Sequence, residues 1–309
     1  MTGIELPVDM RVRIGGLELA NPIMPASGCF GPELAAVMPL ERLGALVTKT
    51  IFAAVRSGNP AHRLAETPHG MLNSVGIPSP GIARFRDEVL PRYRSFGTPV
   101  IVSVGGLVPD EYFEVTAELA DEDFAAVEVN VSCPNLEAGG LAIGVDPLIV
   151  ERVTRGVAAR TQRPVIVKLT PNVSAIGELA AAAEAGGADA VTVANTFTGM
   201  AIDHTSRRPV LGNNVGGLSG PAIKPLALRQ VWEAARRVAI PVIGCGGVCS
   251  AADAVEFLLA GATAVQVGTA TFARPDAMIT ILDGLYDLAR LDDVAAIRDL
   301  TGALRLNQA

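Results

Sequence analysis

Short apolar runs alternate with longer stretches of helical periodicity along most of the chain. An apolar run without polar alternation is typical of a strand that is buried on both faces, as in parallel sheets. Eight such runs are predicted as core strands: Ile23–Ala26, Ala45–Lys49, Val100–Val104, Ala125–Asn130, Val165–Leu169, Ala190–Ala194, Pro241–Cys245 and Ala264–Val267. Helices are predicted at about Pro32–Arg42, Ile82–Ser95, Pro109–Ala120, Pro147–Thr161, Ser174–Ala185, Ala222–Val238, Ala251–Ala260 and Asp276–Ala289. Eight strand–helix units favour a closed α/β structure, a single (β/α)8 TIM barrel, over an open sheet.

Four further segments complete this pattern. Residues Met10–Leu19 alternate around a glycine pair, which predicts a β-hairpin before the first core strand. Long loops are predicted after the second and sixth strands, at Phe52–Pro80 and Thr196–Pro221, and loops of this length are usually functional. The segment Asp292–Arg305 is expected to form one more helix. No shift in composition marks a linker, so residues 1–309 are expected to be a single domain.

Bulk composition narrows the class of protein. Half of the 309 residues are hydrophobic, yet no apolar run is long enough to cross a bilayer and no signal-peptide pattern stands at the N-terminus. We therefore expect a soluble, cytoplasmic protein without a membrane partner. The net charge of −7 argues against a nucleic-acid surface. The four cysteines are too few for a disulfide framework, and Cys245 and Cys249 have no histidine nearby, so no metal site is expected.

Lysine is rare in this chain, which has 22 arginines but only Lys49, Lys168 and Lys224. Lys168 stands within a predicted apolar strand, where an unpaired ammonium would be costly to bury. It therefore predicts an anionic or strongly accepting partner in the interior. Lys49 ends another apolar run, where a solvated strand end is about equally plausible.

Polar residues gather where the fourth predicted strand ends, in the stretch from Glu128 to Asn135. Pro134 favours an extended conformation for Cys133, so the thiol is expected at the mouth of the strand between the amides of Asn130 and Asn135. A buried structural cysteine is the alternative. The dense amide cluster favours a reactive thiol that faces a small polar ligand.

Glycine loops follow the last two core strands, at Gly246-Gly247 and Gly268-Thr269, and a third spans Gly216–Gly220. In (β/α)8 barrels, loops after the late strands often hold a phosphate group with their backbone N–H groups. Phosphate-binding loops on one side, with amides and a thiol on the other, suggest flavin mononucleotide (FMN) above a small planar substrate.

Several of these motifs together resemble one family, the soluble (class 1) dihydroorotate dehydrogenases. The most specific motifs are Asn130–Asn135, Asn73–Ile77 and Gly217–Pro225, and the last of these, with Val167–Val173, resembles the NAD-linked class 1B. The resemblance implies an FMN-containing barrel. It also implies oxidation of (S)-dihydroorotate to orotate in pyrimidine biosynthesis.

The resemblance also implies roles for individual residues. Cys133 would be the base that removes the C5 proton while a hydride passes from C6 to the flavin. Residues expected to hold the pyrimidine are Lys49, Asn73, Ser74, Val75, Gly76, Ile77, Asn130, Asn135, Asn195 and Thr196. Residues expected to bind FMN are Ser27, Lys49, Thr50, Ser103, Asn130, Lys168, Ala194, Gly220, Gly246, Gly247, Gly268 and Thr269. Ser103 stands where members of the family usually have asparagine.

Class 1B membership implies a partner chain. The partner would be an iron–sulfur flavoprotein subunit carrying FAD and a [2Fe–2S] cluster, because this chain has neither a dinucleotide-binding motif nor cysteines spaced for a cluster. A homodimer, and a heterotetramer with that subunit, would follow. The membrane-bound class is disfavoured by a cysteine rather than a serine at position 133.

Other interpretations stay open at this point. A dihydropyrimidine dehydrogenase-like FMN subunit has a similar cysteine loop, and a class 1A enzyme would pass its electrons to fumarate. A tRNA-dihydrouridine synthase would need a basic face, which conflicts with the acidic charge balance. A non-catalytic barrel that binds a phosphorylated ligand would explain the glycine loops but not Lys168 or Cys133.

Overall fold

The computed structural model describes residues 7–132 and 143–307. Eight parallel strands form one sheet in the order β3-β18-β17-β12-β11-β10-β9-β4. Their bounds are β3 Ile23–Pro25, β4 Leu46–Val47, β9 Val100–Val104, β10 Ala126–Asn130, β11 Val165–Lys168, β12 Ala190–Val193, β17 Val242–Cys245 and β18 Ala262–Val267. Every residue of β9, β10, β11, β12 and β17 is buried, as the apolar runs predicted. All eight predicted strands are present, and the prediction of a (β/α)8 barrel is confirmed.

The barrel closes between its first two strands, β3 and β4. The backbone N–H of Gly44 donates to the carbonyl of Ile23 at 2.9 Å. A Cβ at position 44 would lie only 2.0 Å from the carbonyl oxygen of Asn21, so no larger residue fits without a backbone shift. The side chain of Asn21 supports the same seam, because its amide donates to the carbonyl of Arg42 at 2.8 Å. Glycine at position 44 therefore permits the close approach of the two strands.

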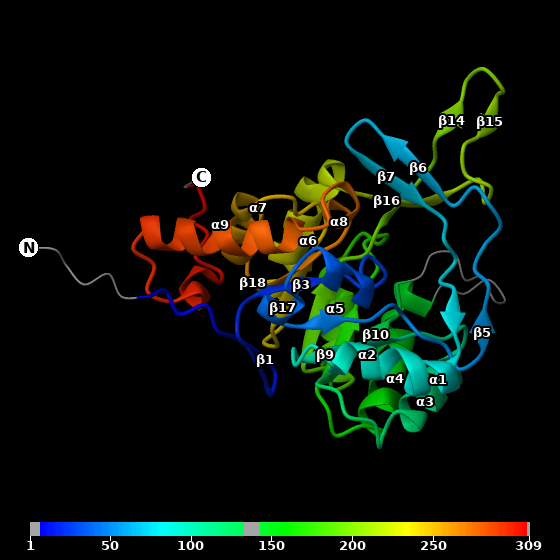
Figure 1. Ribbon diagram of the computed structural model, residues 1–309, viewed down its shortest axis with the longest axis horizontal. Coiled ribbons are helices and arrows are strands. Elements are labelled where there is room, and N and C mark those ends of the chain that lie inside the picture. Colours follow the sequence, from blue (N-terminus) through cyan, green and yellow to red (C-terminus); the bar gives the residue numbers. More distant parts are fainter. Residues whose placement is uncertain (1–6, 133–142, 308–309) are drawn as a thin grey trace, which may run out of the picture.

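Helices surround the strands (Figure 1). The α-helices are α1 Ile82–Arg84, α2 Leu90–Arg94, α3 Pro109–Glu118, α4 Pro147–Ala158, α5 Ile176–Ala185, α6 Lys224–Ala235, α7 Ala251–Leu259, α8 Ala270–Ala273 and α9 Ala277–Leu291. A π-helical turn at Phe85–Val89 joins α1 to α2, and short 3-10 turns lie at Pro32–Ala36, Leu40–Arg42, Ile143–Val145, Pro221–Ile223 and Ile297–Leu300. Among these described helices, none is both long and apolar enough to cross a membrane.

The predicted helix Pro32–Arg42 is wrong. Two short 3-10 turns stand there instead, at Pro32–Ala36 and Leu40–Arg42. The reason is Pro39, which has no N–H to donate and which disfavours helical geometry in the residue before it. The chain therefore leaves the first turn at Val37 and starts a new one after Pro39.

The predicted helix Asp292–Arg305 is also wrong, because only the turn Ile297–Leu300 is helical. Asp293 adopts a left-handed conformation with a φ of 54°, which ends α9. The chain then pairs with the N-terminal segment. Ile297 N–H donates to Asp9 O at 2.9 Å, and Asp9 N–H donates to Ala295 O at 3.0 Å. These tertiary hydrogen bonds replace the ones that a helix would make.

The two long inserts join to form a second sheet, which we name the insert sheet. Its strand order is β13-β16-β7-β6, with β6 Leu64–Thr67 and β7 Gly70–Asn73 from the first insert and β13 Phe197–Gly199 and β16 Gly216–Ser219 from the second. In Figure 1 β6, β7 and β16 lie together at the upper right. Three two-stranded pairs complete the fold: β1 Val12–Ile14 with β2 Leu17–Leu19, β5 Val55–Arg56 with β8 Ser79–Pro80, and β14 Ile202–Asp203 with β15 Arg208–Pro209. The N-terminal hairpin was predicted, but the inserts carry strands rather than loops alone.

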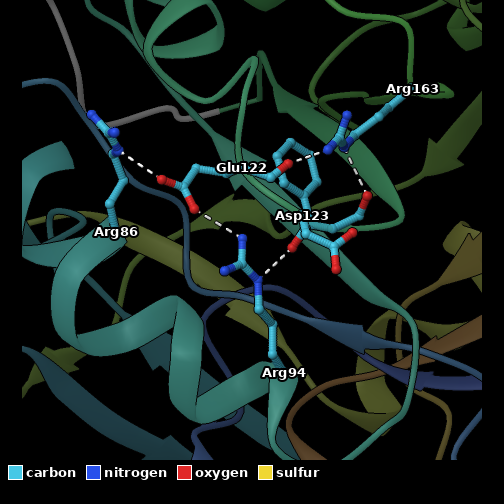
Figure 2. Close-up of polar contacts among 6 residues, drawn as sticks. Arg86, Arg94, Glu122, Asp123 and Arg163 are labelled. Atoms are coloured by element: carbon cyan, nitrogen blue, oxygen red, sulfur yellow. Dashed lines mark hydrogen bonds and ion pairs between the residues drawn. The ribbon is translucent and has the colours of Figure 1, made fainter.

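A cluster of arginines forms ion pairs and hydrogen bonds near the amino ends of the barrel strands (Figure 2). The carboxylate of Glu122, in the segment before β10, accepts from Arg86 at 3.0 Å and from Arg94 at 2.9 Å. The guanidinium of Arg163, just before β11, donates to the carbonyls of Glu122 and Phe124 and lies over the Phe124 ring. Its distance to Phe124 O is 2.8 Å. The hydrogen bond from Arg86, with that from Arg94, holds the pKa of Glu122 below its usual value.

Glu122→Gln is expected to lower the free energy of unfolding by about 1 kcal/mol at neutral pH, since the ion pairs are partly exposed. A carboxyl whose pKa is depressed by folding stabilises the protein above its unfolded pKa, and that stability is lost as the pH falls through the lower folded value. The difference in the free energy of unfolding between wild type and variant should therefore disappear as the pH falls below about 4.5. Urea unfolding at several pH values would check this. A gap that is constant with pH would contradict the assignment.

Candidate active site

A deep pocket opens at the carboxyl ends of the barrel strands, beneath the insert sheet. The pocket, together with open solvent at its mouth, contains about 1240 Å³ of empty space. Leu64, Met71 and Asn73 line it from the first insert, and Gly217 and Ser219 line it from the second. Most residues that the sequence singled out meet in its wall: Ser27, Lys49, Thr50, Asn73, Val75, Gly76, Ile77, Asn130, Lys168, Ala194, Asn195, Thr196, Gly220, Gly246, Gly247, Gly268 and Thr269.

Four expected site residues are not part of this described wall. Ser103 is fully buried behind Thr50, with its hydroxyl 2.9 Å from that of Thr50. Ser74 is also buried, and its hydroxyl has no hydrogen-bond partner among the described residues. Cys133 and Asn135 lie outside the described residues.

A chain of hydrogen bonds orients the amides of the pocket. Asn130 donates from Nδ2 to Thr50 Oγ1 at 2.9 Å and accepts from the hydroxyl of Ser132 at 2.7 Å. Asn195 donates in turn to the hydroxyl of Ser132, and its own Oδ1 accepts from the N–H of Thr196 at 2.8 Å. Because each amide is held at one end by a defined partner, its orientation is set before a ligand arrives.

The two lysines of the pocket have opposite electrostatic surroundings. Burial is the main reason that the pKa of Lys49 is lowered, and the charge of Arg63 adds to this effect. Lys168 is only 2% exposed, and burial opposes its charge as well. Its pKa is nevertheless raised, because acidic groups close to it outweigh the cost of burial. Among the described residues, Lys168 therefore has a carboxyl group and two thiols close enough to raise its pKa, whereas Lys49 has no carboxyl group that does so.

Two functional residues were missed by the sequence reasoning. Lys168 Nζ donates to Gln266 Oε1 at 2.8 Å, and Gln266 Nε2 donates to Glu128 Oε2 at 2.6 Å. Gln266 is the accepting partner that the sequence required for Lys168 without identifying it, and Glu128 is the carboxyl group linked to it. The alternation of side chains along a strand was an available signal. Glu128 stands two residues before Asn130 and so points to the same side of β10.

The three cysteines of the described pocket wall are poor bases. Burial raises the pKa of Cys29 to about 11, although Lys168 and Lys49 oppose that rise. Burial also raises the pKa of Cys245 and of Cys249. At neutral pH these three thiols are therefore protonated. Cys29 was not among the expected site residues.

The glycine loops after β17 and β18 leave room for a group that packs against the backbone. Gly247 has a φ of +78°, and a Cβ there would lie 2.9 Å from the carbonyl oxygen of Gly220. Gly220, Gly246 and Gly268 line the same side of the pocket. The side chain of Lys224 is fixed behind Gly247 by Asp253 at 2.6 Å and Glu256 at 2.8 Å. This bare backbone, with buried Lys168 nearby, fits a phosphate-bearing planar ligand.

Comparison with known proteins agrees with this geometry. The dihydroorotate dehydrogenase family model matches residues 9–288. The dihydroorotate dehydrogenase B (NAD(+)) catalytic subunit of Trichlorobacter lovleyi is 52% identical over 298 residues, which is 96% of this chain and 98% of that protein. The protein of the same name from Geotalea uraniireducens is 49% identical over 300 residues, again 96% and 98% of the two chains.

A solved structure of low sequence identity also supports the fold. The crystal structure of DHODH from Eimeria tenella in complex with ferulenol superposes with a TM-score of 0.79 at 21% identity and covers 98% of this chain and 90% of that one. With the family match over most of its length, the chain belongs to the dihydroorotate dehydrogenase family.

Proposed function

We propose that this chain is the FMN-dependent catalytic subunit of an NAD-linked dihydroorotate dehydrogenase, which oxidises (S)-dihydroorotate to orotate in pyrimidine biosynthesis. The observation that carries the proposal is the single pocket in which Lys49, Lys168 and the oriented amides of Asn130 and Asn195 face the glycine loops. These groups suit a flat anionic substrate on one side and a phosphate-bearing cofactor on the other.

FMN would lie along the glycine loops of the late strands. Backbone N–H groups around Gly246, Gly247, Gly268 and Thr269 would hold its phosphate. Lys168 would stabilise the negative charge that develops on the flavin when it is reduced. The remaining contacts would come from Ser27, Lys49, Thr50, Ser103, Asn130, Ala194 and Gly220, with Ser103 acting through Thr50.

The substrate would lie between the flavin and the insert sheet. Lys49 would pair with its carboxylate, because a partly buried ammonium that has no carboxylate partner among the described residues favours an anionic ligand. The other contacts would come from Asn73, Ser74, Val75, Gly76, Ile77, Asn130, Asn135, Asn195 and Thr196. Asn73 is held in place by a hydrogen bond to the carbonyl of Gly217 at 3.3 Å.

Cys133 would act as the base that takes the C5 proton. A free thiol ionises one to two units above neutrality, and an ammonium such as that of Lys49 would lower this value if it stands beside the thiol. Cys29, Cys245 and Cys249 are protonated at neutral pH and do not compete for this role. When bound, FMN supplies the electron acceptor for the hydride that leaves C6.

Electrons would leave through a partner subunit that carries FAD and a [2Fe–2S] cluster and reduces NAD+. The relatives named as NAD(+)-linked catalytic subunits support this proposal. We propose a single cytoplasmic domain that forms a homodimer, and a heterotetramer with the partner. None of the cysteines Cys29, Cys245 and Cys249 is placed with the spacing that a cluster requires.

Anaerobic titration of the purified chain with dihydroorotate, followed by flavin absorbance, tests the proposal. We expect a yellow protein that is bleached by stoichiometric dihydroorotate and is not reoxidised by NAD+ until the partner subunit is added. A colourless protein that takes up no FMN would overturn the assignment. Reoxidation by fumarate would favour the class 1A alternative, and a response to uracil or thymine instead of orotate would favour the dihydropyrimidine dehydrogenase alternative.

Gly217→Ala is expected to weaken substrate binding while FMN stays bound. A Cβ at position 217 would lie 2.0 Å from Thr196 Oγ1, so Thr196 and the adjacent Asn195 would have to move. Because small displacements of positioning groups are costly, we expect KM for dihydroorotate to rise about 10- to 100-fold. Steady-state kinetics would measure this, with flavin content from absorbance.

Gly199→Ala is the matched control in the same sheet. Its Cβ would meet Leu72 Cδ2 at 3.1 Å and Leu218 Cβ at 3.4 Å, contacts that small side-chain shifts can relieve. We expect its KM to stay within about twofold of wild type. A wild-type KM in the Gly217→Ala variant would show that Thr196 does not contact the substrate.

A further inference from the structure

The interior of the barrel contains a buried carboxylate that the proposed reaction does not use. Glu128 is 0% exposed and stands in the middle of β10. Its Oε2 accepts from Gln266 Nε2 at 2.6 Å, whereas its Oε1 has no hydrogen-bond partner among the described residues. Burying a carboxylate with only part of its hydrogen bonds made is costly, so its presence calls for a reason beyond packing.

Gln266 transmits the effect of this carboxylate to Lys168. A glutamine amide has one donating and one accepting end. Because an ammonium only donates, the end of Gln266 that faces Lys168 must be the oxygen, and its NH2 group must then face Glu128. The two partners thus prevent the amide from flipping, and the fixed amide oxygen accepts from Lys168 Nζ at 2.8 Å.

The other groups around Lys168 are neutral at physiological pH or uncharged. Cys29 and Cys245 face it with thiols whose pKa values are raised by burial, and Ser27 accepts from Nζ at 3.3 Å. Among these surroundings, Glu128 is the one carboxyl group within the described residues, and it reaches Lys168 through the Gln266 amide. Cys245 and Glu128 both favour the charged form of the ammonium buried in β11, and the hydrogen bonds through Gln266 single out Glu128 as the linked group.

We propose that Glu128 is a positioning residue, which acts through the Gln266 amide to keep Lys168 charged and to hold its Nζ at the pocket wall. The inference rests on the proposed function in one respect only, which is that the ammonium acts on a reduced flavin. The charge of Lys168 itself can be measured without substrate or turnover.

The scarcity of lysine makes a direct measurement practical. Protein labelled with 13C at lysine Cε should show three lysine signals, from Lys49, Lys168 and Lys224. Lys49→Arg and Lys224→Arg variants assign them, and NMR titration between neutral and strongly alkaline pH gives each midpoint. In the wild type we expect Lys49 to lose its proton first and Lys168 to hold its proton to higher pH, although Lys168 is the more deeply buried.

Glu128→Gln tests the proposal itself. We expect the midpoint of Lys168 to fall by about one pH unit or more, while that of Lys224 is unchanged. Thr192→Val is the matched control. Thr192 pairs with Lys168 in the register of β11 and β12. It is fully buried, its hydroxyl has no hydrogen-bond partner within residues 7–132 and 143–307, and it carries no charge. This variant should leave the midpoint of Lys168 in place.

Two results would overturn the proposal. One is an unchanged Lys168 midpoint in Glu128→Gln, which would reduce Glu128 to a structural role. The other is a wild-type titration in which Lys168 loses its proton before Lys49, a measurement that needs no variant to fold. A protein that binds no FMN but shows the expected titration order would reject the proposed function and leave this inference intact.

Discussion

With Cys133 replaced by alanine, the protein is expected to fold and bind FMN, while dihydroorotate reduces its flavin about 10²- to 10⁴-fold more slowly. This range is the usual contribution of a general base. Apart from Asn130 at the end of β10, the residues expected to hold FMN lie on other strands and in the glycine loops, so flavin content should not change. Anaerobic stopped-flow mixing with dihydroorotate measures the reduction step without the partner subunit. Near-normal reduction would reject Cys133 as the base.

Cys133→Ser supplies the control for geometry. Serine replaces the thiol with a hydroxyl of similar size, but the pKa of a hydroxyl is far above that of a thiol. We therefore expect slow reduction at neutral pH and a rate that keeps rising at alkaline pH, where the wild-type rate has levelled off. A serine variant whose pH profile matches wild type would indicate that another group takes the proton.

Lys168→Met is expected to have the largest effect on stability, together with loss of rapid flavin reduction. Lys168 is buried and its ammonium is linked through Gln266 to the carboxylate of Glu128. Removing one charge leaves the other buried without compensation, which typically costs about 3–5 kcal/mol. Urea unfolding gives the stability, and stopped-flow reduction gives the effect on the flavin.

The double variant Lys168→Met/Glu128→Gln separates the two effects. It removes both charges, so most of the lost stability should return, although flavin reduction should stay slow because the ammonium is absent. If the double variant were as unstable as Lys168→Met alone, the two charges would not be coupled as the hydrogen bonds indicate. The double-mutant cycle gives that coupling directly.

The barrel was predictable because its strands are buried on both faces. Runs such as Val100–Val104 and Val165–Lys168 are apolar without alternation, and only a parallel sheet covered by helices accommodates several such runs. The two wrong helices have local and tertiary causes. Pro39 was visible in the sequence, whereas the pairing of Asp9 with the segment around Ala296 depends on the closed fold. That residues 1–309 form one domain stays a prediction.

The insert sheet was not predictable, because it pairs strands from two inserts that are distant in sequence. Leu218 lies opposite Leu72 in that register, and nothing in either segment identifies the other as its partner. Long-range antiparallel pairing is set by where the barrel brings the inserts, not by local sequence pattern.

The candidate site was recognised mainly from motifs, and the structure brings most of its members into one pocket. The partners of Lys168 were missed because Glu128 and Gln266 stand on strands that are separated by β11, β12 and β17 in the sheet order. Their side chains meet across the barrel interior, and a contact of this kind requires the closed geometry. The roles of Cys133 and Asn135 stay predictions.

The shared register of β7 and β16 has a consequence for building hybrid enzymes. Gly217 faces Asn73 across that register, and the same two positions line the pocket mouth. A chimera that exchanges residues 52–80 alone with a distant relative would pair β16 with a strand from another protein. The insert sheet would then be misplaced over the pocket. Exchange of residues 52–80 and 196–221 together would transfer the whole insert sheet from one barrel to the other. The hybrid should then have the substrate preference of the protein that supplied both inserts.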